Sequence, residues 1–244
     1  MPLMLALAVI AGIVAARSIV AAVDAHRWDE KDRWYGPVCG VCRSPLGLAT
    51  VRCRASHHRQ RLANPLIMVV TPVLSGALVV SLPTYWVWPA YAVFAWTMVL
   101  LTVVDLDTEL IPNRMLGPAS VISGVLLVVG WVADTGAGSL LRAVAGAVGY
   151  FAAMYLLAVI ARGGLGYGDV KLAGLIGLFT GFLGWQSVLA AGFGAFLVGG
   201  LVSIVLLALR IRSRKDTIPF GPFMTSTAIV AVLWSTEIAA WYSS

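Results

Sequence analysis

Charged residues are scarce in this chain of 244 amino acids: Asp, Glu, Lys and Arg make up 11% of it, against about 25% in ordinary soluble domains. Apolar side chains account for 60% of the residues. So little polar surface cannot cover a water-soluble globule, which excludes a cytosolic enzyme or a secreted domain. A disordered chain is excluded as well, because a sequence this apolar must bury its side chains. The remaining class is a polytopic membrane protein.

Long apolar runs indicate where the chain crosses the membrane, since a helical span needs about 20 mostly apolar residues. Eight runs qualify, the sixth being the shortest: 3–23, 65–82, 88–104, 115–133, 140–161, 170–183, 187–209 and 223–242. The sequence predicts an all-α polytopic membrane protein with about eight transmembrane helices, and six to eight where short runs are re-entrant. The first run has no basic residue before it and no small-residue cleavage site, so we expect a retained span.

Basic residues gather in every second connection between these runs. Of the 17 Lys and Arg residues, all but Arg17 and Arg142 lie in or beside the connections that follow the first, third, fifth and seventh runs. The positive-inside rule places these connections in the cytoplasm and both termini outside. The net charge of +6 therefore indicates topology rather than nucleic-acid binding, and the bilayer is the expected surrounding.

No internal repeat or flexible linker divides the chain, so we expect one membrane domain over 1–244. The only sizeable polar segment is a loop insert at 24–64, which carries all three cysteines, Cys39, Cys42 and Cys53. This cytoplasmic insert after the first helix is too short to fold independently without a cross-link such as a bound metal ion.

Two aspartates stand at the ends of apolar runs: Asp105 directly follows 88–104, and Asp169 directly precedes 170–183. The two runs between them form an out-and-back hairpin, so both carboxylates return to the cytoplasmic edge. They are either loop acids or a pair in which one keeps a proton while the other acts as a base. Asp169 can be the N-cap of the next helix in both cases. Lys171 is either an interfacial anchor or an ion-pair partner.

The surroundings of these aspartates favour a built site. Four glycines within 163–168 precede Asp169, and glycine lets the backbone approach an extended peptide closely. Pro112 gives a rigid turn after the segment that carries Asp105. The acids would also suit a small membrane transporter or proton relay. The chain, however, lacks the inverted repeat that is typical of a transporter, and its acids lie at one membrane edge rather than near the middle of the membrane.

Three motifs resemble those of the type 4 prepilin peptidases: DLDTELIPN at 105–113, LGYGDVKL at 165–172 and IPFGPFM at 218–224. The second is the GxGD motif, shared more loosely with presenilin-type intramembrane proteases. The resemblance implies a multi-pass aspartic endopeptidase of the bacterial inner membrane, with its peptidase core at 88–242. Its substrates would be prepilin or pseudopilin precursors of type IV pili or protein secretion systems. It would cut their basic leader at the cytoplasmic face without a cofactor, and its oligomeric state stays open.

Residue by residue, the resemblance implies Asp105 and Asp169 as the catalytic pair. Asp105 stands seven residues before the proline, as in the family pattern, and Asp107 is the alternative. Other positions would bind substrate or shape the site: Gly166, Gly168, Asp107, Lys171, Pro112, Pro219 and Gly221.

The insert departs from the family pattern of two CxxC pairs, which together look like a zinc site. Cys39 and Cys42 form one pair, but Ser56 stands where the partner of Cys53 belongs. Three thiolates with His57 or His58 would still make a Cys₃His zinc site; otherwise the cysteines are unliganded in a reducing compartment. Many members also methylate the new N-terminus with S-adenosylmethionine, and the incomplete loop leaves this activity in doubt.

Overall fold

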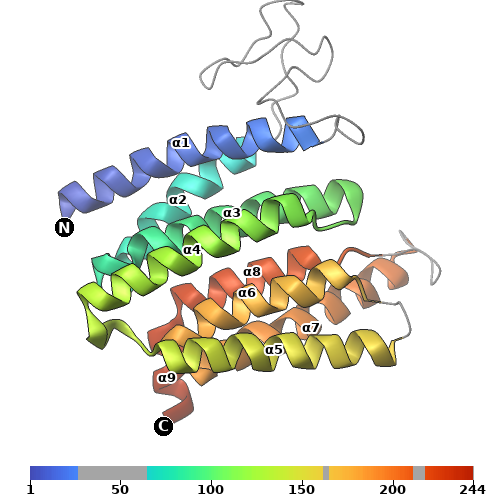
Figure 1. The fold of residues 1–244 in the computed structure, drawn as a ribbon. Coiled ribbons are helices and arrows are strands. Elements are labelled where there is room, and N and C mark those ends of the chain that lie inside the picture. Colours follow the sequence, from blue (N-terminus) through green and yellow to red (C-terminus); the bar gives the residue numbers. More distant parts are fainter. Residues whose placement is uncertain (27–64, 162–164, 211–217, 244) are drawn as a thin grey trace, which may run out of the picture. The chain divides into compact units, whose positions relative to one another are not determined.

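The computed structural model describes residues 1–26, 65–161, 165–210 and 218–243, and this part of the chain contains helices and no strand (Figure 1). The all-α, multi-pass architecture expected from the sequence is thereby confirmed. The chain divides into two compact units, Met1–Val80 and Ser81–Ser244. Most of the insert at 24–64, including the proposed zinc ligands Cys39, Cys42, Cys53 and His57, lies outside the described residues.

The first unit holds helices α1 (Pro2–His26) and α2 (Pro65–Ser81). They approach closely at Gly12, where an added Cβ would lie 2.6 Å from the Cα of Pro72. An added Cβ on Gly76 of α2 would meet the side chain of Leu5 at an ordinary contact distance of 3.4 Å, so Gly12 is the position where the two helices require a small residue.

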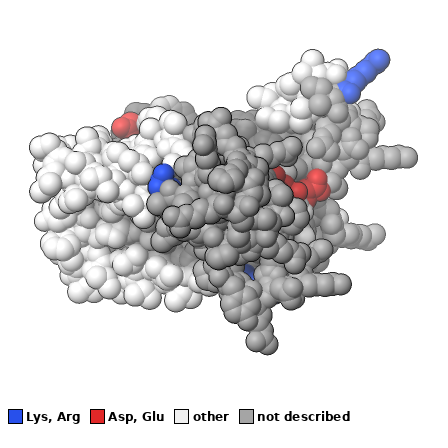
Figure 2. Space-filling view, turned by 90° about the horizontal axis from the view of Figure 1, so that it is seen from above, with Lys and Arg blue, Asp and Glu red and all other residues white. Residues whose placement is uncertain are grey.

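Among the described residues, the second unit contains seven more α-helices and two 3-10 helices, η1 (Tyr85–Val87) and η2 (Thr135–Ala137). The α-helices are α3 (Trp88–Thr108), α4 (Asn113–Ala133), α5 (Leu140–Ile160), α6 (Tyr167–Leu183), α7 (Trp185–Ala208), α8 (Gly221–Leu233) and α9 (Ser235–Ser243). In Figure 1, α3 and α4 run side by side as a hairpin, and α5 packs along α6. Helix α8 contacts α3, α6 and α7. On the face drawn in Figure 2, most of the described surface is uncharged, as a membrane protein requires.

Helices α3 and α6 form the centre of this unit, because more than half of the residues in each are buried. The ring of Phe94 stacks on that of Phe179, with 4.5 Å between their centroids. The hydroxyl of Tyr91 donates a hydrogen bond of 2.7 Å to the carbonyl of Phe179. This aromatic cluster fixes α6 against α3, and with them the two aspartates.

The α5–α6 contact is close enough to require glycine. An added Cβ on Gly146 would lie 2.5 Å from the carbonyl oxygen of Gly177, so the two backbones touch directly. At the far end of α6, Arg142 donates from Nε to Gly181 O at 2.8 Å and from Nη2 to Phe182 O at 2.9 Å. Arg142 lies outside the cytoplasmic connections that hold most of the basic residues. Its guanidinium donates to carbonyls that have no hydrogen-bond partner within α6.

Five helical segments of the described chain are long and apolar enough to span a membrane. They are Pro2–Val20, Tyr85–Thr108, Asn113–Ala133, Leu140–Ile160 and Trp185–Ala208. Helices α8 and α9 give a sixth span if counted as one, although they are bent by 77°. The run predicted at 223–242 is therefore not a straight helix, because Trp234 leaves the helical conformation.

Two predicted boundaries shift in a way that matters for the aspartates. Helix α3 continues to Thr108 and ends at Glu109, which adopts a left-handed conformation with φ 53°. Helix α6 begins at Tyr167, three residues before the predicted start. Asp105 and Asp169 are therefore part of helices rather than flanking residues.

Candidate active site

Asp105 lies in the last turns of α3 and is 4% exposed. Its Oδ2 accepts a hydrogen bond of 3.1 Å from the backbone N–H of Gly221, the first residue of α8. An added Cβ on Gly221 would lie 2.5 Å from the same oxygen, so only glycine lets α8 begin this close to the carboxylate. The structure thus brings together two residues, 116 positions apart, that the sequence analysis placed in one site.

Asp169 lies in the first turn of α6 and is 9% exposed. Gly166 is the N-cap of this helix, so the interpretation of Asp169 as the N-cap was wrong. The backbone N–H of Asp169 donates to Gly166 O at 3.1 Å, and its carboxylate in turn interacts with the backbone N–H of Gly166. The helix starts earlier than expected because Gly166 adopts the extended conformation that a helix start requires.

Both carboxylates are buried, and the charge of Asp105 acts on the carboxyl group of Asp169. They are the only Asp, Glu, Lys or Arg side chains that are buried in the described part of the chain. Burying a charge in a membrane protein is costly, and two neighbouring carboxylates avoid carrying two negative charges by sharing one proton. Such a pair holds both a base and an acid, which is what general acid–base hydrolysis needs.

The connection between α3 and α4, residues 109–112, packs against the start of α6. An added Cβ on Gly168 would lie 2.8 Å from the Cβ of Ile111, so this glycine lets the connection rest on the helix. Pro112 holds an extended conformation at the N-cap of α4. Just beyond it, Lys171 Nζ donates to Asn113 Oδ1 at 2.9 Å. The contacts of Ile111 and Asn113 were not anticipated, since neither residue type signals a role by itself.

A pair of threonines supports the site one turn away from Asp105. The hydroxyls of Thr102 on α3 and Thr225 on α8 are 2.6 Å apart, and Thr225 Oγ1 also donates to Gly221 O at 3.0 Å. This pair ties α3 to α8 beneath the Asp105–Gly221 hydrogen bond. Sequence reasoning missed both residues, although hydroxyl side chains in apolar runs often bond between membrane helices.

The other candidate residues have different surroundings. Asp107 is exposed, two positions beyond Asp105 on α3. Lys171 bonds to Asn113 and lies over the ring of Tyr167 at 4.8 Å, rather than pairing with a carboxylate of the described chain. Pro219 is half-buried just before α8. Among the described residues, no group of three or more His, Cys, Asp or Glu side chains is placed to hold a metal ion.

Comparison with known proteins gives a family match and several relatives. The type IV leader peptidase family matches residues 92–204, a range that contains both buried aspartates. A prepilin leader peptidase/N-methyltransferase of Aeromonas hydrophila is 32% identical over 198 residues, which cover 78% of this chain and 65% of that protein. One of Bacillus subtilis is 29% identical over 226 residues, 84% of each chain.

A third protein of the same name, from Pseudomonas putida, is 31% identical over 201 residues, which are 78% of this chain and 65% of that protein. The chain thus spans slightly less than two thirds of the length of the Aeromonas hydrophila and Pseudomonas putida relatives. No solved structure matches the chain.

Proposed function

The chain belongs to the type IV leader peptidase family, and from that premise we propose that it is an intramembrane aspartic endopeptidase cleaving pilin-like precursors. The observation that carries the proposal is that Asp105 and Asp169 are the buried acids of the described residues, and that the charge of Asp105 acts on Asp169. A carboxylate pair is the device by which aspartic proteases activate water.

In the proposed reaction the pair begins with one proton. The ionised carboxylate takes a proton from water as the water oxygen attacks the carbonyl carbon of the scissile peptide bond. The tetrahedral intermediate then collapses, the C–N bond breaks, and the protonated carboxyl gives its proton to the leaving amine. The pair ends with one proton again, so the reaction consumes one water and needs no other group than the two aspartates.

The backbone around the pair would keep both carboxylates in place during this exchange. Asp105 accepts from Gly221 and Asp169 interacts with Gly166, each at the N-terminus of a helix, where the helix dipole favours negative charge. In this proposal Gly166, Gly168 and Gly221 shape the site by allowing close approach, and Pro112 and Pro219 set the entry of α4 and α8.

We place the reaction at the cytoplasmic face of the bacterial inner membrane, because basic residues mark the connections on that side. The substrate would carry its basic leader to this edge. Asp107 and Glu109 lie exposed at the end of α3, next to Asp105 in the chain, and supply negative charge for such a leader. The proposal covers proteolysis alone, since the insert lacks the fourth cysteine of the family pattern.

The test is a gel-shift assay of a co-expressed pilin-like precursor in membranes that contain each variant. Asp105→Asn and Asp169→Asn should each leave the precursor uncleaved while the protein accumulates in the membrane at the normal level. Glu237→Gln, which removes the charge of an exposed acid on α9, should still cleave. Normal processing by Asp105→Asn or Asp169→Asn would refute the proposal.

A further inference from the structure

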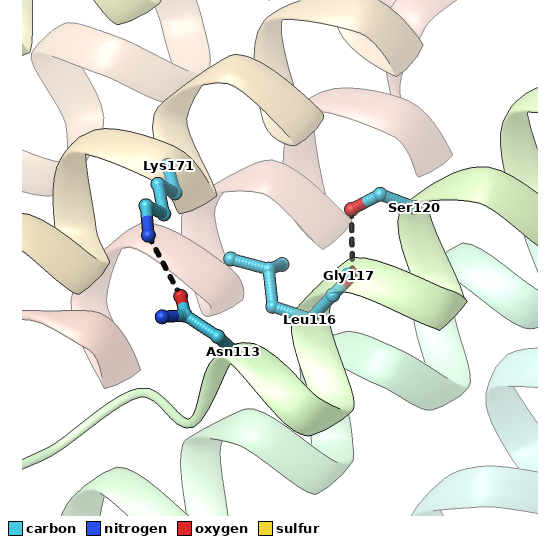
Figure 3. Close-up of a pocket in the computed structure, with 5 residues that line it drawn as sticks. All are labelled: Asn113, Leu116, Gly117, Ser120 and Lys171. Carbon is cyan, nitrogen blue, oxygen red and sulfur yellow. Dashed lines mark hydrogen bonds between the residues drawn. The ribbon is translucent and has the colours of Figure 1, made fainter.

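A pocket of about 350 Å³ lies between the first turns of α4 and α6 (Figure 3). It is lined by Asn113, Leu116, Gly117, Ser120 and Lys171. Lys171 follows Asp169 by two residues, so its side chain leaves α6 on nearly the opposite side. The pocket is therefore separate from the carboxylate pair, and the reaction proposed above makes no use of it.

The pocket holds one charged group, the Lys171 ammonium, beside the side chains of Asn113 and Ser120, and the Ser120 hydroxyl donates to Leu116 O at 2.7 Å. Figure 3 shows the Lys171 ammonium pointing at Asn113, with 2.9 Å between Nζ and Oδ1. This bond uses one of the three ammonium protons. Neither an ion pair for Lys171 nor an acceptor for the Asn113 Nδ2 group occurs within the described part of the chain. The pocket thus offers a positive charge and free N–H groups, which is the chemistry of an anion site.

The location of the pocket narrows the identity of that anion. Asn113 is the first residue of α4, a helix long and apolar enough to cross the membrane. The pocket therefore lies where such a helix meets the headgroup layer. The positive end of the α4 dipole adds to the charge of Lys171.

The pocket also has an apolar side. The buried side chain of Leu116 forms an apolar part of its wall. At exposed Gly117 an added Cβ would meet nothing within 4 Å, so the pocket is open there. A ligand with a charged head and an apolar body would match both sides at once. Basic pockets between transmembrane helices bind anionic lipid headgroups in this way.

We propose that this pocket binds the phosphate of an anionic phospholipid, with Lys171 and Asn113 donating to its oxygens. The acyl chains leave past Gly117, which is exposed, toward the bilayer. The inference is independent of the peptidase reaction, because it concerns groups on another face of α6 and is measured without turnover.

The experiment is native mass spectrometry of the full chain in detergent, titrated with phosphatidylglycerol or with zwitterionic phosphatidylcholine. Lys171→Gln keeps a side chain able to bond Asn113 but removes the charge. It should weaken phosphatidylglycerol binding about fivefold, as expected for one lysine at a membrane surface. Lys171→Arg should restore the affinity. Arg210→Gln, the same loss of charge on the exposed Arg210 next to α7, should leave it unchanged.

Two results would overturn the inference. One is equal phosphatidylglycerol binding by the wild type and Lys171→Gln, with both proteins folded by circular dichroism. The other is displacement of the lipid by inorganic phosphate at equal concentration, which would show that the pocket takes the free anion without a lipid body. Preference for phosphatidylglycerol over phosphatidylcholine, absent in Lys171→Gln and kept in Arg210→Gln, supports it.

Discussion

Replacing Gly221 by alanine tests whether the start of α8 positions Asp105. The added Cβ would stand 2.5 Å from Asp105 Oδ2, inside the distance that real Cβ atoms keep. The carboxylate or the first turn of α8 must then move, and this movement breaks the 3.1 Å hydrogen bond from the Gly221 N–H. The nucleophilic water would no longer face a fixed pair.

The structure sets the size of the effect. A hydrogen bond to a charged group contributes about 1.5–3 kcal/mol. If this contribution is made in the transition state, its loss slows cleavage by roughly 10- to 100-fold, at 1.36 kcal/mol for each factor of ten. Thr225 and Thr102 still tie α8 to α3, so we expect the protein to remain folded.

The assay is the initial rate of precursor cleavage in membranes, corrected for the amount of enzyme. Gly200→Ala on α7 is the matched control, because an added Cβ there meets nothing within 4 Å. We expect the control to cleave at the wild-type rate and Gly221→Ala to be slower by the factor above. Equal rates for the two variants would refute the role of Gly221 in positioning Asp105.

Three further predictions concern contacts that hold the site from a distance. Arg142→Ala should lower the free energy of unfolding by roughly 2 kcal/mol, measured by thermal unfolding in detergent, because α6 loses bonds to its last carbonyls. Tyr150→Phe removes a buried hydroxyl with no partner in the described chain, so stability should stay equal or rise, whereas Tyr91→Phe should lower it by about 1 kcal/mol. Thr225→Val should lower both stability and cleavage rate, and an unchanged melting temperature would contradict the link to α3.

The sequence predicted the class and the main elements, because apolar runs and charge asymmetry follow directly from the physics of the bilayer. It also singled out the buried aspartates, since an acid beside an apolar run is costly unless it has a purpose. The helix ends were harder. No sequence pattern indicated that α3 would continue past Asp105 and end at Glu109 in a left-handed conformation. None indicated that α8 would end at Trp234.

The partners of the aspartates could be predicted only in part. Gly166 was placed next to Asp169 through the resemblance, but the contact of Gly221 with Asp105 depends on how the helices pack. Thr102, Thr225 and Arg142 act through contacts between helices, and one sequence does not give those distances. Arg142 stood outside the charge pattern because it caps a helix instead of marking a loop.

The central claim is that Asp105 and Asp169 act as one catalytic unit. The most direct measurement compares cleavage of a synthetic pilin-like precursor by the reconstituted wild type, the two single Asp→Asn variants and the double variant. If the carboxylates share one proton, each single variant should fall to the background rate, and the double variant should be no slower than either. A single variant that retains a tenth of the wild-type rate would contradict the account.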